Sequence, residues 1–210
     1  IATYNNDTLE DFAGMFRYSQ LLQTVNEADT SILSNITTVK MYKLVTPTLS
    51  EALKYTLSFN NALYNPHSGH NATGGGIISS TGFKISDDDS TNEHFLDDTG
   101  AGVLRVYYLN GATRVYTDAT YGTVDYDTGE VVLTSANITS ISNVDGATST
   151  TIRVFAIPNS NDIVPVRNQV LSIDTSNSTI TGEVDGIISG GSQAGTTYTT
   201  SSSYSSGSST

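Results

Sequence analysis

The alternation of apolar and polar residues along residues 53–60 is the feature that most constrains the fold of this chain. Four apolar side chains alternate with polar ones there: Leu53, Tyr55, Leu57 and Phe59. Successive side chains of a β-strand point to opposite faces, so a period of two predicts a strand with one buried and one wet face. Runs at residues 36–45 and 77–85 are expected to be neighbouring strands. The sequence therefore predicts a mainly β fold, with an antiparallel, hairpin-rich sheet or sandwich.

An Asn-Gly pair at Asn110 and Gly111 lies between two further runs, residues 103–109 and 112–119. Such a pair favours a two-residue β-hairpin, because both residues tolerate a positive φ. The implied register brings three pairs face to face: Tyr107 with Arg114, Arg105 with Tyr116, and Val106 with Val115. The crossed Tyr–Arg pairs are expected to stabilise the hairpin by about 0.5–1 kcal/mol each.

A second hairpin is predicted at Asp127-Thr128-Gly129, where the glycine suits the left-handed position of a three-residue loop. This turn would set Val124 opposite Val132. Strands at residues 151–156 and 168–173 are expected to complete the sheet. Pro165 is expected in the connection between them or at an edge, since proline cannot donate a ladder hydrogen bond.

The N-terminal part carries a helical pattern instead. Thr8, with Asp11 three residues later, resembles a capping box, and a helix is expected from Thr8 to about Val25. Apolar side chains recur on one face of this helix: Leu9, Phe12, Phe16 and Leu22. Such a stripe either packs on the chain's own sheet or docks on another subunit.

Three regions follow from these patterns. Residues 1–34 form a helix and a connecting segment, and residues 35–186 form the antiparallel β region, which can be divided at 35–86 and 92–186. Residues 187–210 form a tail rich in Ser, Thr and Gly. Such a tail is expected to be flexible in isolation, because it cannot bury enough apolar surface to offset its ordering entropy.

Composition excludes several kinds of site and partner. The 210 residues contain no cysteine, so disulfides, thiol nucleophiles and zinc–thiolate sites are absent. The formal net charge is -12 and the basic residues are scattered, which disfavours nucleic acid and anionic membranes as partners. No apolar run approaches the roughly 20 residues that a helix needs to cross a bilayer. Because the chain begins at Ile1, we expect it to be a C-terminal piece of a longer polypeptide.

The residues capable of chemistry do not form a recognisable catalytic or metal-binding pattern. His67 and His70 lie in a glycine-rich loop without a neighbouring acid, so zinc ligation there is disfavoured. Asp87, Asp88 and Asp89 lack the spacing and the central glycine of a calcium loop. No serine lies in a nucleophile elbow with a histidine downstream. We therefore predict no catalytic residue, no cofactor and no bound metal, and hence no enzyme.

Five blocks along the chain resemble the C-terminal part of the large ring-forming baseplate wedge protein of T4-type contractile-tailed phages. The blocks, in order, are residues 16–22, 28–37, 57–64, 79–83 and the stretch 121–174. The Ser/Thr/Gly-rich ending from Ser189 looks more like versions from marine cyanobacterial phages.

The resemblance implies a structural subunit of the virion tail baseplate without catalytic residues. It implies self-association within a ring and contacts with other wedge and hub proteins, and neither nucleic acid nor membrane is an expected partner. The candidate interface residues are Phe12, Phe16, Ile163, Val164, Arg167 and Asn168.

Two other functions stay open at the level of sequence. A carbohydrate-binding or adhesin module of a phage fibre or bacterial surface would fit the tyrosine-rich strands, and exposed tyrosines gathered on one concave face would favour it. A glycan hydrolase would need two carboxylates facing each other about 5–9.5 Å apart.

Overall fold

A computed structural model describes residues 1–10, 14–88, 91–144, 146–166 and 170–183. The chain divides into two units, residues 1–173 and residues 174–210. In the second unit, the Asp174 carboxylate accepts hydrogen bonds from the backbone N–H groups of Ser176 and Asn177, both at 3.2 Å, and so forms a turn. The predicted tail, residues 187–210, lies outside the described residues.

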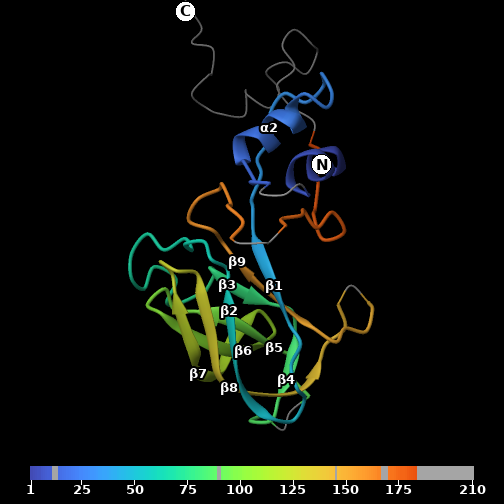
Figure 1. The fold of residues 1–210 in the computed structure, drawn as a ribbon. Coiled ribbons are helices and arrows are strands. Elements are labelled where there is room, and N and C mark those ends of the chain that lie inside the picture. Colours follow the sequence, from blue (N-terminus) through green and yellow to red (C-terminus); the bar gives the residue numbers. More distant parts are fainter. Residues whose placement is uncertain (11–13, 89–90, 145, 167–169, 184–210) are drawn as a thin grey trace, which may run out of the picture. The chain divides into compact units, whose positions relative to one another are not determined.

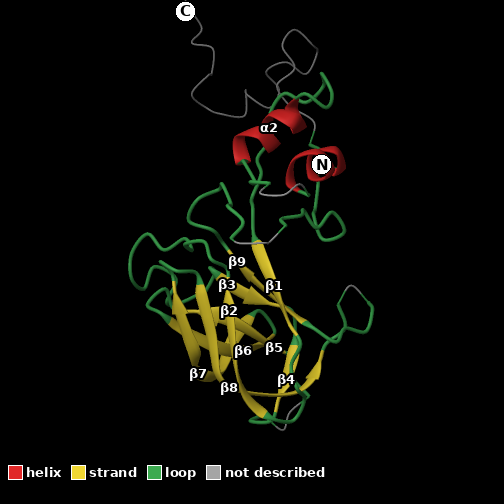
Figure 2. Ribbon diagram, in the orientation of Figure 1, coloured by secondary structure: helices red, strands yellow, loops and turns green. Residues whose placement is uncertain are grey.

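The first unit is mainly β, as the sequence predicts. Of all the residues that the structure describes, 39% are in strands and 10% in helices, and the sheets are antiparallel. Figure 2 shows helices only in the N-terminal part and strands with loops after it. The helical elements are α1 (Ala2–Tyr4), the π-helical turn η1 (Asn5–Leu9) and α2 (Tyr18–Asn26). The strands are β1 (Met41–Val45), β2 (Ala52–Ser58), β3 (Ile78–Ser80), β4 (Phe83–Ile85), β5 (His94–Asp98), β6 (Val103–Asn110), β7 (Thr113–Asp125), β8 (Glu130–Ile141) and β9 (Ile152–Ala156).

Five strands close into a barrel. The larger sheet has the order β2-β8-β4-β5-β6-β7, and β8 also pairs with β7, so the ring runs through β4, β5, β6, β7 and β8 (Figure 1). β8 is long enough to pair with two strands of the ring: its first residues pair with β7 and its last residues pair with β4. β2 lies on β8 outside this ring, from Ser58 opposite Glu130 to Ala52 opposite Asn137.

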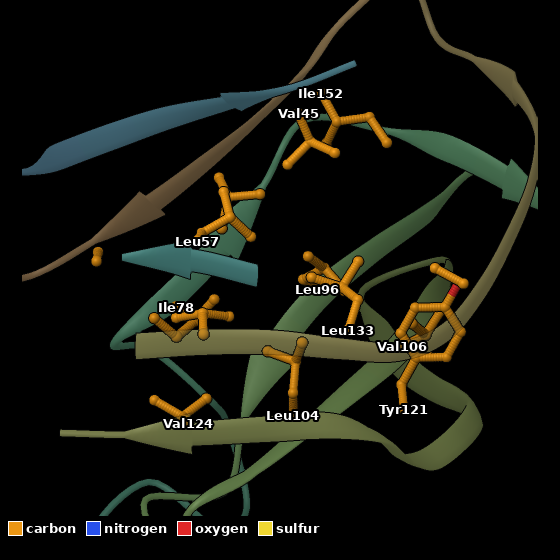
Figure 3. Close-up of a cluster of buried hydrophobic side chains, with 14 of the residues drawn as sticks. Val45, Leu57, Ile78, Leu96, Leu104, Val106, Tyr121, Val124, Leu133 and Ile152 are labelled. Carbon is orange, nitrogen blue, oxygen red and sulfur yellow. The ribbon is translucent and has the colours of Figure 1, made fainter. Parts of the chain in front are cut away.

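A second, three-stranded sheet has the order β1-β9-β3. Its inward side chains and those of the barrel form one apolar core, because Val45, Ile78 and Ile152 belong to the same buried cluster as Leu96 and Leu133. Figure 3 shows these side chains converging from strands of both sheets. Residues far apart in the sequence are thus held by a common core.

The predicted single helix from Thr8 to Val25 is wrong. η1 ends at Leu9, and α2 begins only at Tyr18. Gly14 gives the physical reason: a Cβ at this position would meet the carbonyl oxygens of Thr8 and Leu9 at 2.6 Å, so the chain folds back closely there instead of continuing as a helix. Of the predicted helix face, Leu9 lies in η1, Leu22 lies in α2, and Phe16 lies between them in a β-bridge with Ile163.

Three predicted strands also differ from the structure. The run at residues 77–85 is divided into β3 and β4, and the run at residues 36–45 forms a strand only from Met41. Of the predicted strand 168–173, residues 168–169 lie outside the described residues, and residues 170–173 are not in a strand. Leu171 and Ile173 instead pack against a small apolar cluster near the N-terminus, which places this segment outside the sheets.

The hairpin between β6 and β7 has a different register from the predicted one. Asn110 pairs with Thr113, so the loop is Gly111-Ala112 rather than Asn110-Gly111. Gly111, with φ of 63°, occupies the first loop position, where a type II′ turn requires glycine. Tyr107 consequently lies opposite Tyr116, and Tyr108 opposite Val115.

The crossed Tyr–Arg contacts form nevertheless, because the register shift is two residues at this point and preserves the faces. The Arg105 guanidinium lies over the Tyr116 ring at 4.3 Å, and the Arg114 guanidinium over the Tyr107 ring at 4.6 Å. They are diagonal neighbours rather than directly opposed pairs.

The hairpin between β7 and β8 has a four-residue loop instead of the predicted three. Asp125 pairs with Glu130, and Val124 lies opposite Val131 rather than Val132. The Asp125 carboxylate accepts hydrogen bonds from the N–H groups of Asp127 and Thr128, at 3.0 and 3.1 Å, which draws one more residue into the turn. Gly129 has φ of 72°, the left-handed conformation that the sequence predicts.

Candidate functional site

The predicted interface residues lie in different environments. Phe16 and Ile163 pair with each other through two backbone hydrogen bonds of 3.0 and 2.9 Å, and both side chains are buried. Val164, the next residue, is 49% exposed. Phe12, Arg167 and Asn168 lie outside the described residues. Of the described candidates, Val164 therefore has the side chain most accessible to a partner.

Phe16 and Ile163 belong to a small apolar cluster separate from the main core, together with Tyr4, Leu9 and Leu21. The Tyr4 and Phe16 rings meet edge to face, with centroids 6.1 Å apart. The Asp162 carboxylate accepts a hydrogen bond of 2.9 Å from the backbone N–H of Tyr18, at the start of α2. This cluster ties the N-terminal helices to a segment about 145 residues later in the chain.

The histidines make internal contacts. His70 Nδ1 lies 2.8 Å from Asn65 Oδ1, and the His67 and His70 rings are 5.8 Å apart. His94 is fully buried, and its Nε2 lies 3.1 Å from both Asp88 Oδ2 and Thr117 Oγ1. Burial lowers the pKa of His94 below its ordinary value of 6.5, although the Asp88 carboxylate opposes this shift. Within the described ranges, no group of three or more His, Asp or Glu residues could hold a metal ion.

The most concentrated chemistry surrounds Asp97 on β5, which is buried. Its Oδ1 accepts a hydrogen bond of 2.8 Å from Arg105 Nε, and its Oδ2 accepts bonds from Arg114 Nη1 at 2.7 Å and the Tyr116 hydroxyl at 2.8 Å. Arg105 is also buried and donates to two backbone carbonyls, those of Ala72 and Asp98. The buried charges are thus paired and hydrogen-bonded, which is the condition for placing charge in a protein interior.

Asp98, the next residue, points to a different set of donors. Its Oδ1 accepts hydrogen bonds from the N–H groups of Ile77 and Ile78, at 3.1 and 2.9 Å. Its Oδ2 accepts bonds from Asn71 Nδ2 at 2.9 Å and the Tyr126 hydroxyl at 2.6 Å. One carboxylate therefore joins the loop before β3, the end of β5 and the turn between β7 and β8.

The tyrosines of this network are held in their neutral form. Burial, reinforced by the hydrogen bond to Asp98, raises the pKa of Tyr126 far above its ordinary value of 10.0. Burial and the hydrogen bond to Asp97 likewise raise the pKa of Tyr116, and burial raises that of Tyr107. These hydroxyls can donate hydrogen bonds but are unsuited to act as bases at neutral pH.

The Asp97–Asp98 network connects several elements of the fold through buried hydrogen bonds. Every carboxylate oxygen of the pair accepts at least two hydrogen bonds or one bond from a buried guanidinium, and both residues are almost inaccessible to solvent. The sequence analysis missed this network. The sequence nevertheless contains a signal for it: Asp97, Asp98 and Arg105 lie inside otherwise apolar strands. A charged residue in such a strand needs a partner when it is buried.

In the part of the chain that the structure describes, no helix has the length and apolar character needed to span a bilayer.

Residues 1–44 match the family described as baseplate structural protein gp6, C-terminal domain III. No curated protein matches the chain. The matched segment contains Tyr4, Leu9, Phe16 and Leu21 of the small apolar cluster and extends into β1. The match supports the resemblance at the level of the family over this segment, and it indicates a structural protein located in the tail baseplate of a phage virion.

Proposed function

We propose that this chain is a structural subunit of the wedge and inner ring of a contractile-tail baseplate, which works by contacting copies of itself and other baseplate proteins. The observation that carries the proposal is the family match over residues 1–44. It coincides with a small apolar cluster built from the same segment and Ile163. Structural subunits of this kind need rigid folds and partner surfaces instead of reactive groups.

Two further observations support a role in assembly. The most concentrated set of charged side chains, around Asp97 and Asp98, is buried and saturated with hydrogen bonds. Beside the small cluster, Val164 leaves an apolar side chain 49% exposed, where a partner can cover it. We retain the region of Phe12, Phe16 and residues 163–168 as the proposed interface.

A substitution at Val164 tests the proposal. Val164→Asp should block incorporation of the protein into baseplate rings, measured by electron microscopy of assembled particles, while the melting temperature of the purified chain stays unchanged. Leu109→Asp is the matched control, because Leu109 is 50% exposed but lies at the tip of the β6–β7 hairpin. Normal assembly by the Val164 variant would exclude this interface.

The adhesin alternative makes a different set of predictions. It requires a chain that stays monomeric at high concentration, occupies a fibre tip and binds a surface sugar. The rings or hydroxyls of Tyr107, Tyr116 and Tyr126 are engaged in internal contacts, which favours the assembly role over sugar stacking. Localisation to a fibre tip together with glycan binding would overturn the proposed function.

A further inference from the structure

Solvent exposure alternates without interruption from Asn35 to Pro47. Even-numbered residues are exposed and odd-numbered ones are partly or fully covered, although only residues 41–45 form a strand. This is the period of an extended chain with one face outward. The exposed positions are Ile36, Thr38, Lys40, Tyr42, Leu44 and Thr46, which we call the outward ribbon. At about 3.3 Å per residue, the outward ribbon is roughly 33 Å long.

The outward ribbon presents large apolar side chains to solvent. Ile36 is 100% exposed, Leu44 is 56% exposed, and Tyr42 is 38% exposed with its ring against Phe155. Exposed apolar residues that occur singly need no explanation, whereas several on one narrow face indicate a surface that a partner covers.

β1 is an edge strand, and its edge differs from that of β2. In the larger sheet, the pairing of β2 with β8 is irregular between Leu53 and Tyr55, where the exposed Lys54 lies opposite two residues of β8. An irregular register makes a strand edge less suited to pairing with another chain. β1, at the edge of the smaller sheet, keeps an unbroken register with β9 over all five residues. A regular edge of this kind can accept an added strand.

The charge around the outward ribbon indicates which partner fits it. Lys40 and Lys43 are the only charged residues between residues 30 and 50. The whole chain has a formal net charge of -12, and because this segment contributes +2, the remaining residues carry -14. Pairing this segment with the same segment of a second copy would bring four lysines together without a carboxylate, and like charges across a strand pair are destabilising.

We propose that the outward ribbon docks an extended segment of another polypeptide, in which apolar residues alternate with Asp or Glu. The segment lies along β1. Its apolar side chains cover Leu44 and Ile36 on the outward face, and its carboxylates lie on the opposite face, beside Lys43. The inference adds a class of partner to the proposed structural role. It rests on that role only for which protein supplies the segment. The surface itself follows from exposure, edge geometry and charge.

The experiment measures binding of a fluorescent peptide to the whole chain by anisotropy. The probe is a synthetic peptide of about ten residues that alternates Glu and Val, and its control alternates Lys and Val, so both can add as strands but only one has the complementary charge. We expect the acidic peptide to bind at least about tenfold more tightly than the basic one, with a preference that weakens at high salt.

Substitutions then locate the binding surface. Leu44→Ser and Lys43→Glu should each weaken binding of the acidic peptide by about tenfold or more. Leu109→Ser and Lys54→Glu are matched controls, since they change a similarly exposed leucine and a lysine on β2, and they should leave binding unchanged.

Three results would overturn the inference: no binding of the acidic peptide, equal binding of the basic peptide, or binding that Leu44→Ser and Lys43→Glu leave intact. A fourth result would be self-association of the chain, measured by sedimentation, that is abolished by Leu44→Ser but is not inhibited by the acidic peptide. A second copy of the chain would then cover the outward ribbon. Incorporation into baseplates, tested through Val164→Asp, is a separate readout, so failure of the peptide experiment leaves the proposed function standing.

Discussion

At the scale of single residues, the unusual feature of this protein is charge inside a β core. Asp97 and Arg105 are buried, yet each polar atom of the pair has a partner within 3.0 Å. Such a pair adds little net stability compared with apolar residues, but removing one member leaves the other charge unpaired in a dry interior. The network is therefore expected to respond strongly to substitutions that change its charge.

Asp97→Asn should lower the free energy of unfolding by about 3–5 kcal/mol, because it leaves the buried Arg105 guanidinium without its counter-charge. Chemical denaturation followed by circular dichroism measures the change. Asp127→Asn, at an exposed turn position, is the control and should alter stability by less than about 0.5 kcal/mol. Equal effects of the two variants would mean that the Asp97 pairing is unimportant for stability.

His94 should make stability depend on pH. Its pKa in the folded state is lowered by burial, so it stays neutral there while the unfolded chain takes up a proton below about pH 6.5. The stability that neutral His94 contributes is therefore complete above pH 6.5 and is lost as the pH falls through the lowered folded-state pKa. Denaturant midpoints measured between pH 7.5 and pH 5 should decrease for the wild-type chain.

Acidic residues also contribute to this decrease, so the decisive readout is the difference between the wild type and His94→Gln. Glutamine keeps a donor near Asp88 and Thr117 but cannot take up the proton. We expect the variant to lose less stability than the wild type between pH 7.5 and pH 5. Parallel pH profiles would contradict this assignment.

At the scale of elements, local sequence patterns predicted the positions of strands more accurately than the pairing between them. The alternation of Leu53, Tyr55 and Leu57 correctly predicts β2, because strand period is a local property. Both hairpin registers were predicted wrongly, since a turn's length depends on hydrogen bonds such as those to the Asp125 carboxylate. The N-terminal helix was overextended because apolar spacing alone does not reveal the reversal at Gly14.

The β7–β8 turn offers a direct test of this turn chemistry. Gly129→Ala should cost more than about 2 kcal/mol, because alanine is strained at φ of 72° and its Cβ would contact the Asn61 carbonyl oxygen. Gly111→Ala should cost only about 1–2 kcal/mol, since φ is 63° but no atom lies within 4 Å of the added Cβ. Thermal denaturation compares the two variants, and a larger loss for Gly111→Ala would refute the role of the Asn61 contact.

At the scale of the whole molecule, barrel closure and the Asp97–Asp98 network could not be predicted from the sequence. β8 pairs with β2, β4 and β7, and these pairings join residues far apart in the chain. Apolar alternation reports that Val131 and Leu133 face a core, but it does not report which strand lies beside them. The Tyr–Arg contacts could be predicted from one hairpin, but Asp97 lies on another strand, β5. The sequence therefore did not reveal that Asp97 binds both arginines.

The purified chain should not need a metal ion for stability. Adding a chelator should leave its melting temperature unchanged, because the described residues contain no group of three or more potential ligands that could hold an ion. Differential scanning fluorimetry with and without chelator measures this. A fall of several degrees that calcium reverses would point to Asp87 and Asp88 as ligands.

The strand order has a consequence for synthesis on the ribosome. β1 and β2 emerge early, but their partners β9 and β8 are among the last strands to be made. Ala52 and Asn137 are paired, and translation at about 5–20 residues per second separates them by roughly 4–17 s. During that interval, β1 and β2 are unpaired in the nascent chain, and their apolar side chains are exposed to neighbouring polypeptides. Lys54, exposed on β2, is suited to keep that strand apart from other nascent chains until β8 arrives.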